Sequence, residues 1–296
     1  MRGSLLYVST VVVRVRHQIL IFFWKGRKMK VHMFGLIAAA FVWILASCAF
    51  AGSINTALQF DGSNDFVSVS DNDALSPQIV GEITTSAWVK MDVDSLGGVV
   101  LAKGASSQGW EYAIGIWPDG RATFTIWTPG GGVAIQVAGG VITPGQWYNI
   151  TGTYEQGTAT VYLNGNLVDQ SDSFTPPIAN GSGKLCFGKE DHAVHPWNYK
   201  GAIDEVSLWN YAKTGVEVQQ LFSTTLSGTE QGLVAYWNFN EGSGQVVTDI
   251  TGHGYNGILG TSSAIDSADP TWVAGVPEPI TLILLGLGGV IIRKRR

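Results

Sequence analysis

Short runs of alternating apolar and polar residues, bounded by glycine, asparagine, aspartate or proline, recur through the centre of this 296-residue chain. Successive side chains of a strand point to opposite faces, so this alternation favours strands with one buried face. Helical periodicity is limited to one short candidate near residues 214–221. We therefore expect strands that include residues 66–69, 84–89, 112–117, 122–127, 133–137, 148–154, 159–163 and 201–209.

Turn signals separate these runs at short intervals. The alternating run Thr160–Leu163 is followed by Asn164-Gly165, a pair that favours a tight hairpin. Glycine accounts for 38 of the 296 residues, which suits many tight turns because glycine adopts positive φ without strain. Many short strands with frequent turns predict an all-β fold, an antiparallel two-sheet jelly-roll sandwich, with hydrophobic segments at both ends of the chain.

Charge is divided unevenly between the ends and the centre of the chain. Seven basic residues lie at or before Lys30 and four after Ile292, whereas these end segments hold one acidic residue, Glu278. The centre therefore has seven basic and 22 acidic residues, a net charge near −15. Such a surface repels phosphate backbones and excludes nucleic-acid binding, but it suits the recruitment of cations by carboxylates.

Residues 1–51 are predicted to be an upstream extension followed by a signal peptide. An apolar run from Phe34 to Ala51 follows Lys30 and closes on Ala49-Phe50-Ala51, the order of a secretory signal. A transmembrane helix is the alternative, although a run of about 18 residues is borderline for spanning a bilayer. Leu45-Ala46-Ser47-Cys48 resembles a bacterial lipobox, which would place a lipid on Cys48. We expect ordinary cleavage after Ala51 instead.

The C-terminal residues 276–296 have three parts. Pro277-Glu278-Pro279 is followed by an apolar run, Ile280–Ile292, and by the basic residues Arg293–Arg296. A helix of that run rises about 20 Å, short of a hydrocarbon core of about 30 Å, so a buried terminal helix or a marginal span would compete on physical grounds. The order of the three parts resembles the PEP-CTERM sorting signal of Gram-negative bacteria.

This resemblance implies where the protein goes. Proteins with such a tail are exported through a signal peptide and held as precursors in the inner membrane by the C-terminal segment. An exosortase-type sorting enzyme is their expected partner and would cleave near Pro277, Glu278 and Pro279. We therefore expect a protein of the cell envelope, the cell surface or the extracellular matrix.

Residues 52–275 resemble a laminin-G-like (concanavalin A-like) jelly-roll domain. The resemblance implies two curved, packed antiparallel sheets with a concave face. A segment at residues 232–254 resembles a stretch that often precedes such a domain, and we expect it to supply the last strands of this one; a truncated second repeat is the alternative. The motifs that carry the resemblance are Leu58–Val67, Thr85–Lys90, Pro144–Tyr148, Gly152–Tyr154, Val161–Gly165 and Gly201–Val206.

A structural calcium ion is the expected cofactor. Asp61, Asn64 and Asp65 crowd one turn, and the resemblance places the late strand that begins near Asp204 beside this turn. Calcium takes six to eight oxygen ligands, so Asp61, Asn64 and Asp204 are the expected ligands, with Asp65 in reserve. The alternative is an Asx-rich turn whose side chains bond to their own backbone.

The tryptophans divide into two groups. Those in strand motifs are expected in the core: Trp88, Trp147, Trp209 and Trp237. Those in less regular stretches flanked by glycine or proline are candidates for stacking on a sugar ring: Trp110, Trp117, Trp127 and Trp197.

Three further groups of residues could in principle form chemical sites. Asp191, His192 and His195 could hold a metal, but two histidines without a positioned third ligand more often form a solvated loop. Asp204 and Glu205 are adjacent and should point to opposite faces, unlike the paired carboxylates of a glycosidase. Cys186 is expected to be a small buried strand residue. The sequence also lacks G-x-S-x-G, H-E-x-x-H and phosphate-loop motifs, so catalysis is not expected.

These observations predict an exported, non-catalytic domain that binds carbohydrate and is stabilised by Ca²⁺. The sorting-signal resemblance implies an extracellular polysaccharide as the ligand. Two alternatives stay open: a structural or adhesive protein that binds protein partners through an apolar patch, and a cryptic glycan-cleaving enzyme with two carboxylates in a cleft.

Overall fold

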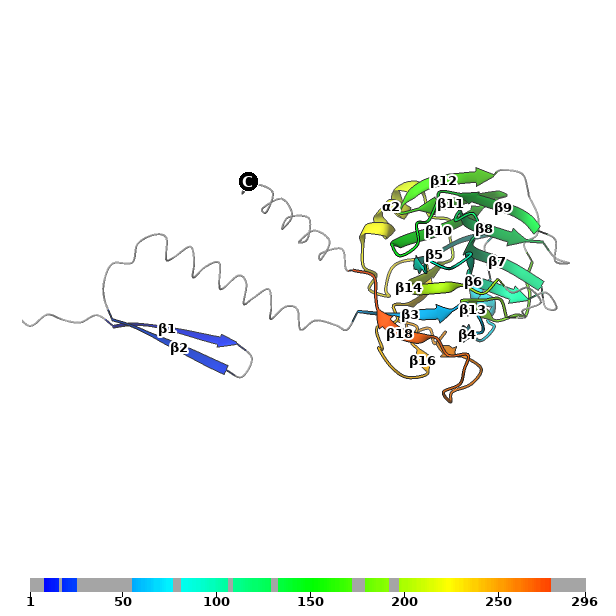
Figure 1. Cartoon of the computed structure of the whole chain (residues 1–296). Coiled ribbons are helices and arrows are strands. Elements are labelled where there is room, and N and C mark those ends of the chain that lie inside the picture. Colours follow the sequence, from blue (N-terminus) through cyan, green and yellow to red (C-terminus); the bar gives the residue numbers. More distant parts are fainter. Residues whose placement is uncertain are drawn as a thin grey trace, which may run out of the picture. The chain divides into compact units, whose positions relative to one another are not determined.

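The computed structural model describes residues 8–15, 18–25, 55–76, 81–105, 109–128, 133–171, 179–191 and 197–277. The chain divides into two compact units, residues 1–53 and 54–296. In the first unit, β1 (Val8–Val15) and β2 (Gln18–Lys25) pair as an antiparallel hairpin (Figure 1). The expected signal peptide, Cys48 and the apolar run 280–292 lie outside the described residues. Within the described residues, no helix is long and apolar enough to cross a membrane.

The second unit contains two antiparallel sheets of eight strands each (Figure 1). The first sheet has the order β12 (Asn166–Ser171), β11 (Thr158–Leu163), β10 (Trp147–Glu155), β5 (Glu82–Met91), β14 (Lys200–Trp209), β3 (Thr56–Asp61) and β18 (Thr271–Ala274), and β15 (Leu233–Trp237) also pairs with β14. The second has the order β16 (Val246–Val247), β17 (Gly257–Leu259), β4 (Val67–Val69), β13 (Leu185–Phe187), β6 (Gly98–Ala105), β7 (Gly109–Ile116), β8 (Ala122–Trp127) and β9 (Val133–Gly139).

This architecture confirms the all-β, two-sheet jelly-roll sandwich. The turn between β11 and β12 is the predicted hairpin, with Asn164 at φ +51° and Gly165 at φ +76°, the paired positive values that suit a two-residue turn. The predicted helix is α2 (Gly215–Ser223), which begins after Thr214. The Thr214 side chain accepts from the Glu217 amide, and the Glu217 carboxylate accepts from the Thr214 amide, so two backbone groups that a helix start leaves unpaired are satisfied. A short 3-10 turn, η1 (Asp73–Leu75), follows β4.

The main core lies between the two sheets and is built from the side chains of both sheets that point inward, in general every second residue along a strand. Leu58, Val89 and Ile150 of the first sheet and Ile114 and Phe124 of the second are completely buried there. Burial of apolar surface on this scale is the main favourable term in folding. Cys186 of β13 is likewise buried and is a free thiol, as expected.

Two of the four tryptophans expected in the core lie elsewhere. Trp237 is fully buried in the core, and Trp209 is buried in a smaller separate cluster. Trp88 is half-buried and stacks on Phe222 of α2 at 5.3 Å between ring centroids. Trp147 is half-buried beneath the Lys90 ammonium. The expectation was wrong for these two because Ala87 and Val89 of β5 face the core, so that Trp88 and Lys90 point to the opposite face of the sheet. Trp147 of β10 is paired with Lys90 and therefore lies on that opposite face as well.

The close approach of the two sheets depends on a glycine. A Cβ added at Gly152 of β10 would lie 2.5 Å from Cγ of Phe124 in β8, a distance that real side chains do not tolerate. The Phe124 ring therefore fills the space that a side chain at residue 152 would need, and the sheets are held at the spacing this contact allows.

We predict that Gly152→Ala destabilises the protein by about 1–3 kcal/mol, because the added methyl overpacks the core against the Phe124 ring. Chemical denaturation measures the change. In the double variant Gly152→Ala/Phe124→Leu the loss should be smaller than the sum of the single losses, since the second change makes room for the methyl. Gly215→Ala is the control, because the nearest atom to its added Cβ is 3.8 Å away. Additive losses, or equal losses in Gly152→Ala and Gly215→Ala, would contradict the packing argument.

Candidate functional site

A cavity of about 330 Å³ opens at the surface where the loop after β5, the start of β6, the end of β7 and the segment before β14 meet. Its polar and aromatic lining comes from Asp94, Ser95, Trp197, Asn198 and Lys200, and Pro118 adds an apolar side chain. The Trp197 side chain is 51% exposed, the only tryptophan among the exposed large apolar residues that the structure describes. An exposed ring beside hydrogen-bonding groups is the arrangement expected of a small-ligand site.

Two consecutive glycines position the segment that carries Trp197. Gly97 and Gly98 have φ values of +86° and +139°, and a Cβ at Gly98 would lie 2.7 Å from the Asn198 carbonyl oxygen. The backbone of β6 can therefore approach residues 197–199, where the Val99 amide donates to the Trp197 carbonyl at 2.8 Å. This contact fixes the backbone of Trp197 and leaves its ring at the cavity.

The charged side chains of the lining form an ion pair, and two more acidic residues lie on neighbouring segments. The Lys200 ammonium lies 2.5 Å from the Asp94 carboxylate, and this hydrogen bond raises the pKa of Lys200 and lowers the pKa of Asp94. Asp61 is the strand partner of Lys200 across β3 and β14, and the Asp92 amide donates to the Lys200 carbonyl at 3.2 Å. Asp94 is thus the carboxylate in contact with the ammonium, while Asp61 and Asp92 lie on the segments next to Lys200.

The other three candidate tryptophans lie outside this cavity lining. Trp110 and Trp127 meet at 5.6 Å between ring centroids, and Trp127 packs on a small apolar cluster with Val99 and Ala102. Trp117 is half-buried, and the Arg121 guanidinium lies 4.6 Å over its ring. The structure therefore brings Trp110 and Trp127 together, and neither lines the Trp197 cavity.

A second cavity, of about 320 Å³, lies between the end of β14 and α2. Its aromatic wall is already occupied: the Lys213 ammonium is 3.3 Å from the centroid of the Trp209 ring and donates to the Tyr211 hydroxyl at 2.7 Å. A ligand ring could not stack there without displacing Lys213, so the Trp197 cavity is the better candidate.

The expected calcium turn has the hydrogen bonds of an Asx turn. The Asp61 carboxylate accepts from the amides of Ser63 and Asn64 at 2.7 and 3.3 Å. The Asp65 carboxylate accepts from the Asp61 amide at 2.9 Å, and the Asn64 side chain donates to the Ser267 carbonyl at 2.6 Å. The Asp61 and Asp65 carboxylates thus bond to the local backbone, as the alternative interpretation anticipated, whereas Asn64 bonds to a segment distant in the sequence.

The structure does not bring Asp204 to this turn. The partner of Asp61 on β14 is Lys200, and Asp204 lies four residues further along the strand, about 13 Å away. Its buried carboxylate accepts from the amides of Glu205 and Val276, each at 2.8 Å. Asp61, Asn64 and Asp204 therefore do not fit one calcium ion in this structure, and calcium binding by the turn itself stays a prediction.

The other site residues predicted from the sequence are the Asp191, His192 and His195 group and the motif at residues 277–279. Among the described residues, no group of three or more histidine, cysteine, aspartate or glutamate side chains could hold a metal. The Asp191 carboxylate accepts from the Lys184 amide at 3.0 Å. His192, His195, Glu278 and Pro279 lie outside the described residues, and Pro277 is exposed at the end of the described chain.

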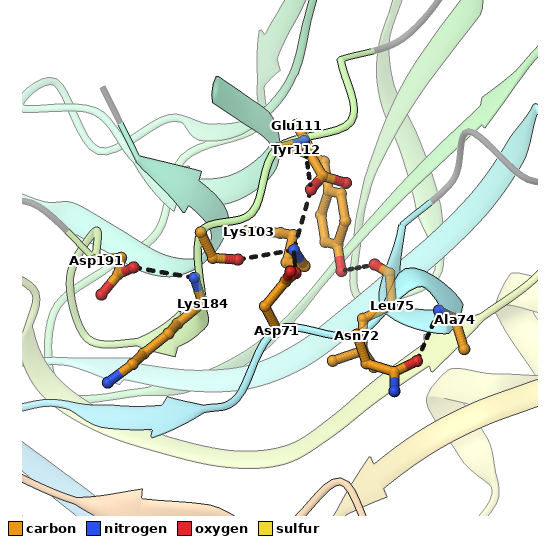
Figure 2. Close-up of polar contacts among 11 residues, drawn as sticks. Asp71, Asn72, Ala74, Leu75, Lys103, Glu111, Tyr112, Lys184 and Asp191 are labelled. Carbon is orange, nitrogen blue, oxygen red and sulfur yellow. Dashed lines mark hydrogen bonds and ion pairs between the residues drawn. The ribbon is translucent and has the colours of Figure 1, made fainter. Parts of the chain in front are cut away.

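A buried charged group that the sequence did not reveal lies on β6 and β7. The Lys103 ammonium contacts the carboxylates of Asp71 and Glu111 at 2.6 and 3.0 Å and donates to the Gly183 carbonyl at 2.7 Å (Figure 2). A bulge opposite Lys103 makes Glu111 an extra residue beside Tyr112, which breaks the alternation that would expose a charged side chain. Lys103 and Glu111 are both completely buried.

This group has the carboxylate spacing of a glycosidase but not its arrangement. Both carboxylates lie within 3.0 Å of the same ammonium nitrogen, so their oxygens are less than about 6 Å apart, a separation found in retaining glycosidases. Lys103 occupies the space between them (Figure 2), where a glycosidic bond would have to lie. The group is therefore an ion-pair network within the protein interior.

The comparisons with known proteins identify the fold family. A family model described as the concanavalin A-like lectin/glucanases superfamily (Laminin_G_3) matches residues 61–219, more than half of the chain. No curated protein matches the chain.

Several solved structures are similar in fold. A crystal structure of a protein named as a candidate carbohydrate binding protein from Bacteroides ovatus ATCC 8483 is 19% identical, with a TM-score of 0.54 over 76% of this chain and 61% of that chain. A heptameric SAP-like pentraxin from Limulus polyphemus is 15% identical over 57% of this chain and 82% of that chain, with a TM-score of 0.46. Mouse laminin alpha1 domains LG4-5 are 15% identical over 52% of this chain and 40% of that chain, with a TM-score of 0.41. The chain thus spans about three fifths of the Bacteroides protein, and the likeness concerns the fold.

We predict that Lys103→Met destabilises the protein by about 3–5 kcal/mol, because it leaves the buried Glu111 carboxylate without its cation. Thermal and denaturant unfolding measure the loss. The double variant Lys103→Met/Glu111→Gln should recover about 1–2 kcal/mol of it, since no buried charge remains uncompensated. A double variant less stable than Lys103→Met would contradict the explanation that the unpaired Glu111 charge causes the loss of stability.

A second prediction concerns pH. Burial, with the nearby carboxylates of Asp61 and Asp269, raises the pKa of Asp65 from 3.8 to about 6. The native state then binds a proton more tightly than the unfolded state, so this group's stabilisation is full below about pH 4 and is lost as the pH rises through 6. Asp65→Asn should be more stable than the parent at pH 7, by at most about 2–3 kcal/mol, and equal to it near pH 4. Parallel stability curves of the two proteins between these pH values would contradict the assignment.

Proposed function

The chain belongs to the concanavalin A-like lectin/glucanases superfamily, and on this basis we propose that it is a non-catalytic domain that binds carbohydrate at the Trp197 cavity. The observation that carries the proposal is the exposed Trp197 ring beside the side chains of Asp94, Asn198 and Lys200 in a cavity of about 330 Å³. That volume is at the lower end of the range for small-ligand sites and suits one or two sugar rings.

The chemistry of the lining suits a sugar. The apolar C–H face of a sugar ring can pack on the indole of Trp197, because an aromatic ring combines a large apolar face with weak directional polarity. Sugar hydroxyls both donate and accept, so they can donate to the Asp94 carboxylate and accept from the Lys200 ammonium. Hydrogen bonds to charged groups of this kind are the stronger ones.

We also propose export to the cell surface or extracellular matrix of a Gram-negative bacterium. The signal-peptide pattern of residues 34–51 and the PEP-CTERM-like order of residues 276–296 support this destination. An exosortase-type enzyme would process a precursor that the C-terminal segment holds in the inner membrane, and an extracellular polysaccharide would be the ligand.

An adhesive function is the second candidate, and one observation favours it. Val93 and Leu96, in the loop that carries Asp94, are 84% and 79% exposed, and Leu96 lines the Trp197 cavity. Exposed apolar side chains beside a tryptophan can also form the centre of a protein-protein contact.

We predict that Trp197→Ala weakens binding of the purified protein to its polysaccharide at least about tenfold, a loss of about 1.4 kcal/mol, because the stacking face is removed. Affinity electrophoresis through gels that contain a panel of soluble polysaccharides measures the change. Trp147→Ala is the control, since Trp147 is a half-buried tryptophan that lies outside the cavity. Unchanged binding in Trp197→Ala, or an equal loss in both variants, would remove the cavity from the proposal. Binding to no polysaccharide, with association to proteins that Leu96→Asp abolishes, would favour the adhesive function.

A further inference from the structure

We propose that the Trp197 cavity selects glycans with free, positively charged amino groups and rejects glycans with carboxylates; this inference rests on the carbohydrate binding proposed above. Among the described residues that line the cavity, Lys200 is the one cationic side chain and Asp94 the one anionic side chain. The selectivity depends on the negative charge of Asp61 and Asp92, which lie on the segments next to this pair.

The positive charge of the lining is already used. The Lys200 ammonium is bound to the Asp94 carboxylate at 2.5 Å. Asp61 is opposite Lys200 in the register of β3 and β14, and the Asp92 amide, just after β5, donates to the Lys200 carbonyl. A ligand carboxylate would have to displace Asp94 from the ammonium and would still lie close to three acidic residues. Like charges at such distances repel, even where water screens them.

Arg121, three residues after Pro118 of the lining, adds no free positive charge. Its guanidinium is bound to the Asp119 carboxylate at 2.8 Å while covering the Trp117 ring. The central part of the chain has 22 acidic and seven basic residues, so the excess charge that acts on a ligand within a Debye length of about 8–10 Å of the surface is negative as well.

A protonated amine, in contrast, has partners at the cavity. The Asp94 side chain is 65% exposed, and a carboxylate can accept several hydrogen bonds, so the bond to Lys200 leaves acceptor capacity for a ligand ammonium. The exposed Trp197 ring offers a second contact, because a cation is attracted to the face of an indole. Aromatic surface with an excess of carboxylate is how proteins recognise cationic groups.

The test compares three sets of oligosaccharides of equal length by titration calorimetry with the purified protein. β-Linked glucosamine oligomers carry the amine, N-acetylglucosamine oligomers of the same linkage carry a neutral amide instead, and glucuronate-containing oligomers carry the carboxylate. We expect the glucosamine oligomers to bind at least about tenfold more tightly than the acetylated ones at low salt, and the uronate oligomers not to bind. The preference should shrink towards nothing in about 1 M salt, where the Debye length is about 3 Å.

Two variants of the same ion pair should change amine binding in opposite directions. Asp94→Asn removes the exposed acceptor charge and should weaken binding of the glucosamine oligomers about tenfold, whereas Lys200→Met removes the competing cation and should strengthen it several-fold. Methionine keeps an aliphatic stem at the place where the Lys200 stem packs on Gly62. Asp73→Asn, at an exposed carboxyl outside the cavity, is the control and should leave all three affinities unchanged.

The outcomes separate this inference from the proposed function. Equal affinity for amine and amide oligomers, binding of the uronate oligomers, or loss of binding in both ion-pair variants would overturn the selectivity and leave carbohydrate binding in place. Binding of no oligosaccharide at all would overturn carbohydrate binding itself, and the selectivity with it.

Discussion

The pairing of β14 is the constraint on which both the core and the cavity depend. One edge of this strand pairs with β5, and the other pairs first with β3 and then with β15. A bulge between Asp204 and Ser207 marks the change of partner and holds Glu205 at φ +52°, a left-handed conformation that costs about 1–2 kcal/mol outside glycine. The buried Asp204 carboxylate accepts two backbone amides there, which compensates its burial and ties the end of the domain at Val276 to the middle of the sheet. The first residue of the same strand, Lys200, lies at the cavity.

The parts of the fold that depend on neighbouring residues could be predicted from the sequence. Alternation located the strands, and Asn164-Gly165 located a hairpin, because both signals act within a few residues of the chain. The place of Asp204 could not be predicted in this way. Spacing along the chain shows that Asp204 lies on a late strand, but only the register of β14 against β3 shows that Lys200, and not Asp204, faces Asp61. Register is set by contacts between distant segments, so it is not visible in either segment alone.

The same limit applied to the candidate site. Trp197 could be singled out because a tryptophan in an irregular, proline-flanked stretch is not an ordinary strand residue. Asp94 and Lys200 gave no signal, because the two residues of this ion pair are 106 positions apart. The Gly97-Gly98 pair was the one local feature that could have indicated the cavity, since consecutive glycines often permit a close approach of two backbones. Lys103 and Glu111 were hidden for a different reason: a single bulge reverses the face that alternation assigns.

The use of the few basic residues connects the fold to the proposed selectivity. The central part of the chain has seven bases, and six of them are engaged by a carboxylate or an aromatic ring: Lys90, Lys103, Arg121, Lys189, Lys200 and Lys213. A cation that covers a ring or neutralises a carboxylate contributes to stability through short-range contacts, but it leaves little positive potential at the surface. The same part of the chain has 22 acidic residues, so negative charge predominates in what a ligand meets. A protein whose basic side chains already contact its own carboxylates and aromatic rings is poorly suited to hold a polyanion. This is the physical reason to look for its ligand among glycans that are neutral or cationic.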